Sequence, residues 1–196
     1  MKPAIILFIV LSSAALNAQQ NPYEAGVQQK FAPGGTIRLH LEAGGYTISP
    51  TDSGNIVVTY HANTASQFGR VKVEIKPAAL SADVYVTGTP HNNFNATIEV
   101  PRRSNLWVRL TAGQLNVEDV DGDKDVEMWA GQLDIEIPHP EAYGHRDASI
   151  IAGSLDASAF NVAKGGLFRS FHDEGPGKYR LHAHVTTGEI DLRGTE

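Results

Sequence analysis

The chain has 196 residues, of which 16 are basic and 22 acidic, so its formal net charge is −6, and it contains no cysteine. The basic residues are scattered, whereas nucleic acid or an anionic membrane surface requires concentrated positive charge, so we exclude both as partners. The lack of cysteine excludes disulfide bonds and thiolate metal sites. Burial and hydrogen bonding must therefore stabilise the fold.

The first 18 residues have the features of a secretory signal peptide. Lys2 is followed by the unbroken apolar run 4–11 and then by small residues. That run is much shorter than the ~20 residues that a membrane-spanning helix requires. We expect cleavage after Ala18, with cleavage after Ala15 as the alternative, so that the mature chain has no transmembrane segment. The product is expected to be exported, with a periplasmic, cell-surface or secreted location.

The rest of the chain is long enough for one domain with a substantial core and short for two. We expect a lead or cap segment over residues 19–30 and one domain over 31–196. Apolar residues recur at every second position, and Gly, Pro, Asn or Asp interrupts them every several residues, as is typical of half-buried strands. Strands are predicted over 36–41, 70–76, 106–110, 133–137 and 179–185.

A short motif recurs along the chain, consisting of a glycine, a variable residue, an inward Leu or Ile and then Asp or Asn. We place its glycines at Gly45, Gly113, Gly131, Gly153 and Gly188. The last four are 18, 22 and 35 residues apart, and we explain the widest gap by an inserted loop at about 160–178. Periods near twenty residues indicate units that bury their apolar faces only by stacking. The sequence therefore predicts an all-β, single-domain β-solenoid, a β-helix-like stack of strand–glycine–strand rungs.

These motifs in this order resemble a bacterial family, the putative-adhesin domain of unknown function, whose members are exported β-solenoids. The likeness rests on the segment 31–39, the glycine motifs, the turn at 120–123 and the ending at 175–181. It covers about residues 31–194, and segment 66–93 fits it poorly and is interpreted as a lateral hairpin. The resemblance implies a surface or extracellular location and an adhesin-like role, and it supplies no catalytic residues.

The polar residue after the inward Leu or Ile has the same character in four copies of the motif: Asn116, Asp134, Asp156 and Asp191. If rungs stack in register, these side chains approach to about 4.8 Å, and a row of carboxylates repels itself unless it is relieved. Three explanations stay open. The residues are solvated turn-proximal groups, they alternate with cations from neighbouring strands, or they bind calcium or a sugar.

Exposed aromatic side chains on a β-surface can stack on sugar rings. Trp107 faces away from the apolar side of its strand and Trp129 lies beside Met128. The candidate ligand-binding residues are therefore Trp107, Trp129, Asp134, Asp156 and Asp191. We predict an exported, non-catalytic surface or adhesin-like scaffold or binding protein, with a cell-surface protein or a glycan as the open choices of partner. The alternative is a carbohydrate-binding or polysaccharide-active β-helix protein that uses the rung aspartates.

Two further polar clusters are interpreted without a metal ion or a cofactor. The acidic segment 119–125 lacks the glycine and glutamate positions of an EF-hand, and Asp-Gly at its centre is typical of a turn. His182 and His184 alternate with the apolar residues of their strand, which places both on the solvent face. A zinc site there would need His172 or Asp173 of the preceding segment as a further ligand.

Overall fold

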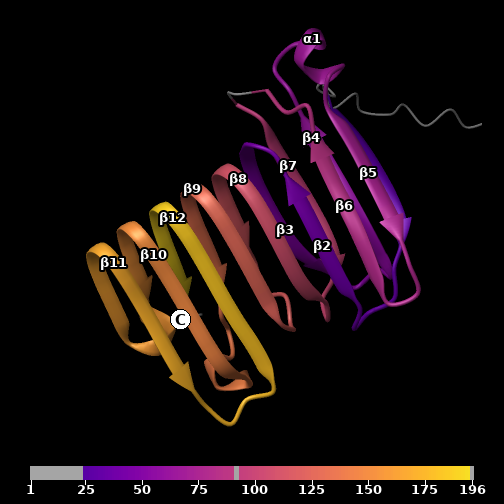
Figure 1. Cartoon of the computed structure of the whole chain (residues 1–196). Helices are drawn as coiled ribbons and strands as arrows, with labels where there is room; N and C mark the ends of the chain where they lie inside the picture. Colours follow the sequence, from indigo (N-terminus) through magenta and orange to yellow (C-terminus); the bar gives the residue numbers. More distant parts are fainter. Residues whose placement is uncertain (1–23, 91–92, 195–196) are drawn as a thin grey trace, which may run out of the picture.

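The computed structural model describes residues 24–90 and 93–194, and the predicted signal peptide lies outside these ranges. The described chain is all-β apart from helix α1 (Ala65–Phe68) and the 3-10 turns η1 (Pro140–Ala142) and η2 (Ser158–Phe160). Within it, no helix has the length and apolar character needed to span a bilayer. Twelve strands form a single sheet that stays open (Figure 1).

The strands in chain order are β1 (Glu24–Lys30), β2 (Thr36–Leu41), β3 (Gly44–Thr51), β4 (Asn55–His61), β5 (Lys72–Pro77), β6 (Ser81–Thr87), β7 (Asn95–Pro101), β8 (Asn105–Val117), β9 (Lys124–Glu136), β10 (Tyr143–Ala157), β11 (Val162–Glu174) and β12 (Tyr179–Arg193). The five strands predicted from period-two alternation are confirmed as β2, β5 and parts of β8, β9 and β12.

The sheet bends, so that it has two arms with the core between them (Figure 1). The first arm contains β5, β6, β2 and the amino-terminal halves of β8, β9, β12 and β10. The second arm contains β1, β4, β7, β3 and the carboxyl-terminal halves of the same long strands. Strand β11 runs in the opposite direction along β10 and contributes to both arms.

Four aligned glycines form the bend of the long strands. Gly113 pairs with Gly131, Gly131 with Gly188, and Gly188 with Gly153. All four have φ between +126° and +141°, a region that disfavours residues with a Cβ. A Cβ at Gly131 would also overlap the carbonyl oxygen of Gly113. The glycines are therefore required both by backbone conformation and by the close approach of neighbouring strands.

The prediction of Gly45 as a member of this glycine row was wrong by one residue. Gly44 pairs with Gly113, whereas Gly45 pairs with Gln114. At this position the chain is divided into β2 and β3 rather than continuous, and a Cβ on Gly44 would come within 2.7 Å of the Phe94 ring. The packing of Phe94 thus requires a glycine here.

The order of strands in space differs from their order in the chain. Strand β12, the last in the sequence, lies between β9 and β10 and is parallel to both. In the same way β2 lies between β6 and β8, again in parallel. Antiparallel pairs occur at the two ends of the sheet, where β11 pairs with β10, β5 with β6, β4 with β7 and β1 with β4.

Three segments outside the repeated motif are now placed, and the first of them differs from the sequence expectation. The expected loop at 160–178 instead contains β11, an edge strand that pairs with β10 through its backbone while Phe171 is its buried side chain. This strand was missed because one buried residue gives no alternation. Within segment 66–93, β5 and β6 form an antiparallel hairpin, and β6 joins the sheet through β2. The expected lead segment is, from Glu24 on, the edge strand β1.

The core consists of aliphatic and aromatic side chains from both arms, with one basic exception. Lys124 of β9 is 2% exposed and occupies an inward position, with Leu106 and Leu181 as its register partners. Its Nζ donates to the carbonyl oxygen of Val120 at 2.6 Å and to the hydroxyl of Tyr143. Burial lowers the pKa of Lys124 from 10.5 to about 8, against the opposing effect of the acidic residues in 119–123.

Candidate functional site

The outer face of the second arm carries the polar residues of the repeated motif in a single row. Asn116 pairs with Asp134, Asp134 with Asp191, and Asp191 with Asp156. On the far side of Asn116, Thr47 of β3 continues the row. The strand register therefore brings the three predicted aspartates together, as neighbours on β9, β12 and β10.

Arg193, at the end of β12, partly relieves the repulsion within this row. Its Nε lies 2.8 Å from Oδ1 of Asp134, its Nη2 contacts the other oxygen of that carboxylate, and its Nε is 3.8 Å from Asp191. Of the three explanations left open by the sequence, pairing with a cation from a neighbouring strand thus describes Asp134. Asp156 has no cation within ion-pair distance among the described residues.

Asp191 lies in a different electrostatic environment from Asp134. Burial raises the pKa of Asp191, the neighbouring Asp134 raises it further, and Arg193 opposes the change. Both carboxylates line a groove of about 460 Å³ on the outer face. The groove also contains a chain of side-chain hydrogen bonds, in which Gln114 donates to Gln132 at 2.7 Å and Gln132 donates to Glu189 at 3.2 Å.

On the outer face of the first arm, one row of residues places a basic residue or a histidine beside each aspartate. The row reads, strand by strand, Lys76, Asp83, Arg38, Trp107, Asp125, His182, Asp147 and His172. Opposite charges on adjacent strands stabilise a sheet, whereas like charges destabilise it. In this row no two aspartates are neighbours, in contrast to the aspartate row of the second arm.

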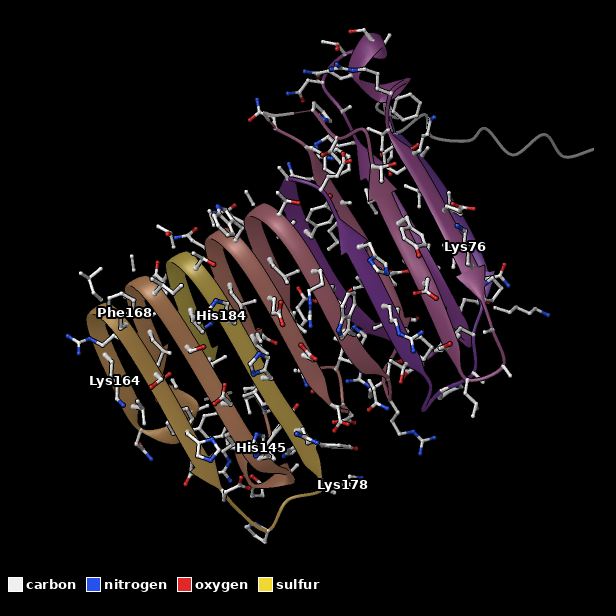
Figure 2. The ribbon with its side chains drawn as sticks, in the orientation of Figure 1. Lys76, His145, Lys164, Phe168, Lys178 and His184 are labelled. Carbon is white, nitrogen blue, oxygen red and sulfur yellow. The ribbon has the colours of Figure 1, made fainter. Side chains whose placement is uncertain are left out.

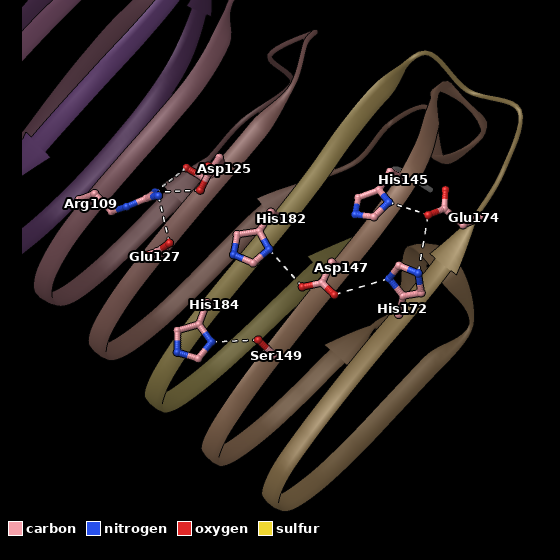
Figure 3. Close-up of polar contacts among 10 residues, drawn as sticks. All are labelled: Arg109, Asp125, Glu127, His145, Asp147, Ser149, His172, Glu174, His182 and His184. Carbon is pink, nitrogen blue, oxygen red and sulfur yellow. Dashed lines mark hydrogen bonds and ion pairs between the residues drawn. The ribbon is translucent and has the colours of Figure 1, made fainter.

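Trp107 lies in this row, and its ring is covered by other side chains. The guanidinium of Arg109 is 4.0 Å from the centre of the indole, and the ring of His40 is 5.1 Å away. Arg109 also pairs with Asp125 and Glu127, at 2.9 and 3.0 Å, which holds the guanidinium in place (Figure 3). Trp107 is therefore only partly exposed, and Arg109 occupies a face of its ring that a ligand would need.

Trp129, by contrast, is 69% exposed and lies in β9 just before the bend. It borders a shallow depression of about 260 Å³ whose polar lining comes from Arg109, Thr111, Glu127, His184 and Thr186. Further exposed apolar side chains follow along the bend toward the β11 edge, where Phe168 lies (Figure 2). The structure therefore separates the five predicted residues, since the aspartates lie on the second arm and the tryptophans on the first arm and at the bend.

The histidines of the carboxyl-terminal strands lie on the solvent side of the first arm, as predicted for His182 and His184. These two have separate partners, because Nδ1 of His182 is 3.1 Å from Asp147 and Nδ1 of His184 is 2.9 Å from the Ser149 hydroxyl (Figure 3). Asp173, considered as a further metal ligand, instead pairs with Arg146 at 2.5 Å.

Sequence reasoning missed His145 and Glu174, which the pairing of β10 with β11 brings beside His172. The available signal was a pair of titratable residues at a spacing of two in each strand, His145 with Asp147 and His172 with Glu174. That spacing places each pair on one face of its strand. Only the antiparallel register, which the sequence does not supply, makes the two pairs neighbours.

The acidic segment 119–125 spans the turn after β8 and the first two residues of β9. Gly122 has a φ of +137°, and Asp121 forms an isolated parallel bridge with Arg103. Asp119 accepts from Arg102 at 2.7 Å, and the Asp123 carboxylate accepts from the backbone amide of Arg180 at 2.9 Å. These contacts match a turn between parallel strands, as the Asp-Gly pair predicts.

Comparison with known proteins gives a likeness of fold. No protein-family model matches the sequence, and no curated protein matches it. The crystal structure of a putative cell adhesion protein from Clostridium sporogenes aligns with a TM-score of 0.54 at 12% identity, over 88% of this chain and 100% of that one.

Two other crystal structures align with lower TM-scores. A putative adhesin from Bacteroides fragilis has a TM-score of 0.32 at 7% identity, over 88% of this chain and 98% of its own. A putative lipid binding protein from Parabacteroides distasonis has a TM-score of 0.30 at 11% identity, over 89% and 96%. The described chain therefore shares the fold of the Clostridium protein.

Proposed function

We propose that this protein is an exported, non-catalytic surface protein of the adhesin type, and that it binds carbohydrate through Trp129. The observation that carries the proposal is the exposed indole of Trp129 beside a depression lined by polar side chains. The fold likeness to a protein named for cell adhesion supports the surface role. The membership in the adhesin-domain family that the sequence motifs suggest is part of the same proposal.

We infer that the architecture is a short β-solenoid. Strands β8, β9, β12 and β10 pair in parallel, and around the bend glycine pairs with glycine. Each later residue of the motif likewise pairs with its equivalent on the neighbouring strand. The glycine row at the bend has the regularity that stacked rungs require. Antiparallel strands at both ends then act as caps, which cover the edges of the parallel stack.

The chemistry around Trp129 suits a sugar ring. A flat indole offers apolar contact to the C–H side of a pyranose, while nearby charged and hydroxyl groups can hydrogen-bond its ring hydroxyls. Arg109, Glu127 and Thr186 supply such groups within the same depression. Trp107 does not serve, because Arg109 covers its ring.

The test is a screen of the purified protein on an array of bacterial and host oligosaccharides, followed by a fluorescence titration with the strongest binder. Trp107→Phe leaves Trp129 as the single tryptophan reporter. We expect a saturable change in its emission. In isothermal titration with the same sugar, which needs no tryptophan, we expect Trp129→Ala to weaken binding about tenfold or more, which corresponds to about 1.4 kcal/mol. If Trp129→Ala binds as strongly as the wild type, the site lies elsewhere. If no oligosaccharide on the array binds the protein, carbohydrate is not its ligand.

A polysaccharide-active protein is the second candidate, and the environment of Asp191 favours it. Glycoside hydrolysis uses two carboxylic groups held in different protonation states. Asp191 and Asp134 lie side by side in the groove of the second arm. Burial raises the pKa of Asp191, whereas Asp134 accepts a hydrogen bond from the guanidinium of Arg193. The test is the release of reducing ends from a polysaccharide. If Asp191→Asn and Asp134→Asn both lose this activity and Trp129→Ala keeps it, polysaccharide cleavage replaces carbohydrate binding as the function.

A further inference from the structure

We propose that the protein binds a Zn²⁺ ion on the outer face of the first arm, through His145, His172 and Glu174. These residues and Asp147 form the β10–β11 histidine cluster. His145 and Asp147 lie on β10, and His172 and Glu174 lie on the edge strand β11. The antiparallel register sets His145 opposite Glu174 and Asp147 opposite His172, so two imidazoles and two carboxylates alternate at the corners of a square (Figure 3).

The ligand atoms are already close to the spacing of a metal site. Nδ1 of His145 lies 2.7 Å from Oε1 of Glu174, and Nε2 of His172 lies 3.6 Å from the same oxygen. One ligand atom from each of the three residues fits within a mutual distance of 4.8 Å. Bond lengths of 2.0 to 2.2 Å in a tetrahedral zinc site imply ligand atoms about 3.3 Å apart. Small side-chain rotations on a paired backbone are therefore sufficient to form the site.

Asp147 supplies the support that metal-binding histidines usually have. Its Oδ2 lies 3.6 Å from Nδ1 of His172, the ring nitrogen that faces away from Glu174, and its Oδ1 lies 3.1 Å from Nδ1 of His182. A carboxylate beside the second nitrogen of a ligating imidazole fixes the ring orientation and the tautomer. Nε2 of His172 is thereby directed toward the shared oxygen of Glu174.

A second group of candidate ligands, Asp125, Glu127 and His182, makes a useful comparison. There the guanidinium of Arg109 lies 2.9 Å from one carboxylate and 3.0 Å from the other, so their charge is already compensated. In the histidine cluster, Glu174 and Asp147 form ion pairs only with histidines among the described residues. The nearest basic residue by register is Arg180, which pairs with His145 from β12. The histidine cluster is thus the better cation site.

The ligand set selects the kind of metal. Two imidazoles and one carboxylate suit Zn²⁺ and the neighbouring transition metals, whereas Ca²⁺ and Mg²⁺ require oxygen ligands. Three protein ligands also leave a coordination position open on this face, where a water molecule or an outside donor can bind. The site is distinct from Trp129 and from the aspartate groove, so it stands whether or not the proposed carbohydrate binding is correct.

The experiment is isothermal titration of the purified protein, without an affinity tag, with ZnCl₂, together with Co²⁺ absorption as a reporter of coordination. We expect one Zn²⁺ per chain and a rise in melting temperature. His145→Ala, His172→Ala and the isosteric Glu174→Gln are each expected to weaken binding at least tenfold. Asp147→Asn is expected to weaken it by about tenfold, as for other residues that orient a ligand.

His184→Ala is the matched control, because this histidine lies on the same face and bonds Ser149 outside the cluster. It is expected to keep the wild-type affinity within about twofold. Melting temperatures without metal identify any variant that fails to fold, and Glu174→Gln then decides the outcome since its exposed side chain supports no core packing. A protein that takes up no Zn²⁺, or one whose affinity falls equally in His184→Ala and Glu174→Gln, would overturn the proposal.

Discussion

Lys124 of β9 donates a hydrogen bond to the hydroxyl of Tyr143 of β10, inside the core and across the intervening strand β12. The lysine fills an inward position whose register partners on both neighbouring strands are leucines. A buried ammonium is costly unless it is well paired, and here the carbonyl of Val120 and the Tyr143 hydroxyl are its hydrogen-bond acceptors. Folding stability must therefore depend on the protonation of this one group.

We predict that stability conferred by Lys124 rises between about pH 8 and pH 10. Burial lowers its pKa to about 8 in the folded state from 10.5. In this window the unfolded chain binds the proton more than the folded chain does, so the free energy of unfolding increases with pH. Relative to Lys124→Met, the wild-type protein should gain about 2 kcal/mol between pH 7 and pH 9.5, because each unit of pKa difference corresponds to 1.36 kcal/mol.

Urea denaturation of both proteins at several pH values measures this difference. The exposed Lys178→Met is the control and should show no such slope (Figure 2). Measurements stay below pH 10, because burial raises the pKa of Tyr143 and its ionisation in the unfolded chain then reverses the trend. A constant difference between wild type and Lys124→Met from pH 7 to 9.5 would contradict the prediction.

Gly131→Ala should destabilise the protein by at least about 3 kcal/mol, if it folds at all. The residue has a φ of +128°, and its new methyl group would overlap the carbonyl oxygen of Gly113 on the adjacent strand. Gly165→Ala in β11 is the matched control, since nothing lies within 4 Å of its added Cβ. We expect it to change stability by less than about 1 kcal/mol. Equal melting temperatures for the two variants would show that the bend tolerates side chains.

Much of the fold follows from local signals in the sequence, and the glycine row illustrates why. Gly113 and Gly131 are each followed by Gln, an inward Leu and then Asn or Asp, so the motif itself aligns the two glycines. In the β2–β3 segment two consecutive glycines precede Tyr46, and the motif leaves the choice between them uncertain by one position. Packing against Phe94 and the pairing of Gly44 with Gly113 decide it.

The order of the strands could not be predicted, and the candidate sites depend on that order. Period-two alternation shows which residues of a strand share a face, but it does not identify the neighbouring strand. The insertion of β12 between β9 and β10 sets Asp191 between Asp134 and Asp156. The edge strand β11 had no alternation to reveal it, so the meeting of His145 with Glu174 was equally hidden.

The last prediction concerns the aspartate row, where two substitutions should act in opposite directions. Burial and the neighbouring Asp134 raise the pKa of Asp191, while Arg193 lowers it. A carboxyl group whose pKa is raised by folding favours the folded state at low pH and opposes it once ionised. At pH 7 Arg193→Gln should therefore lower stability by about 0.5 to 1 kcal/mol, the size usual for partly exposed ion pairs, and Asp191→Asn should raise it.

Both differences should become smaller at pH 3, because protonated carboxyl groups neither repel each other nor need a cation. Thermal unfolding monitored by circular dichroism at pH 7 and at pH 3 provides the comparison. The two variants combined should approach wild-type stability at pH 7, since removal of the Asp191 charge offsets the loss of Arg193. If Asp191→Asn instead destabilises the protein at pH 7, the ionised carboxylate makes a favourable contact. Repulsion between the aspartates would then not determine how the Asp191 charge affects stability.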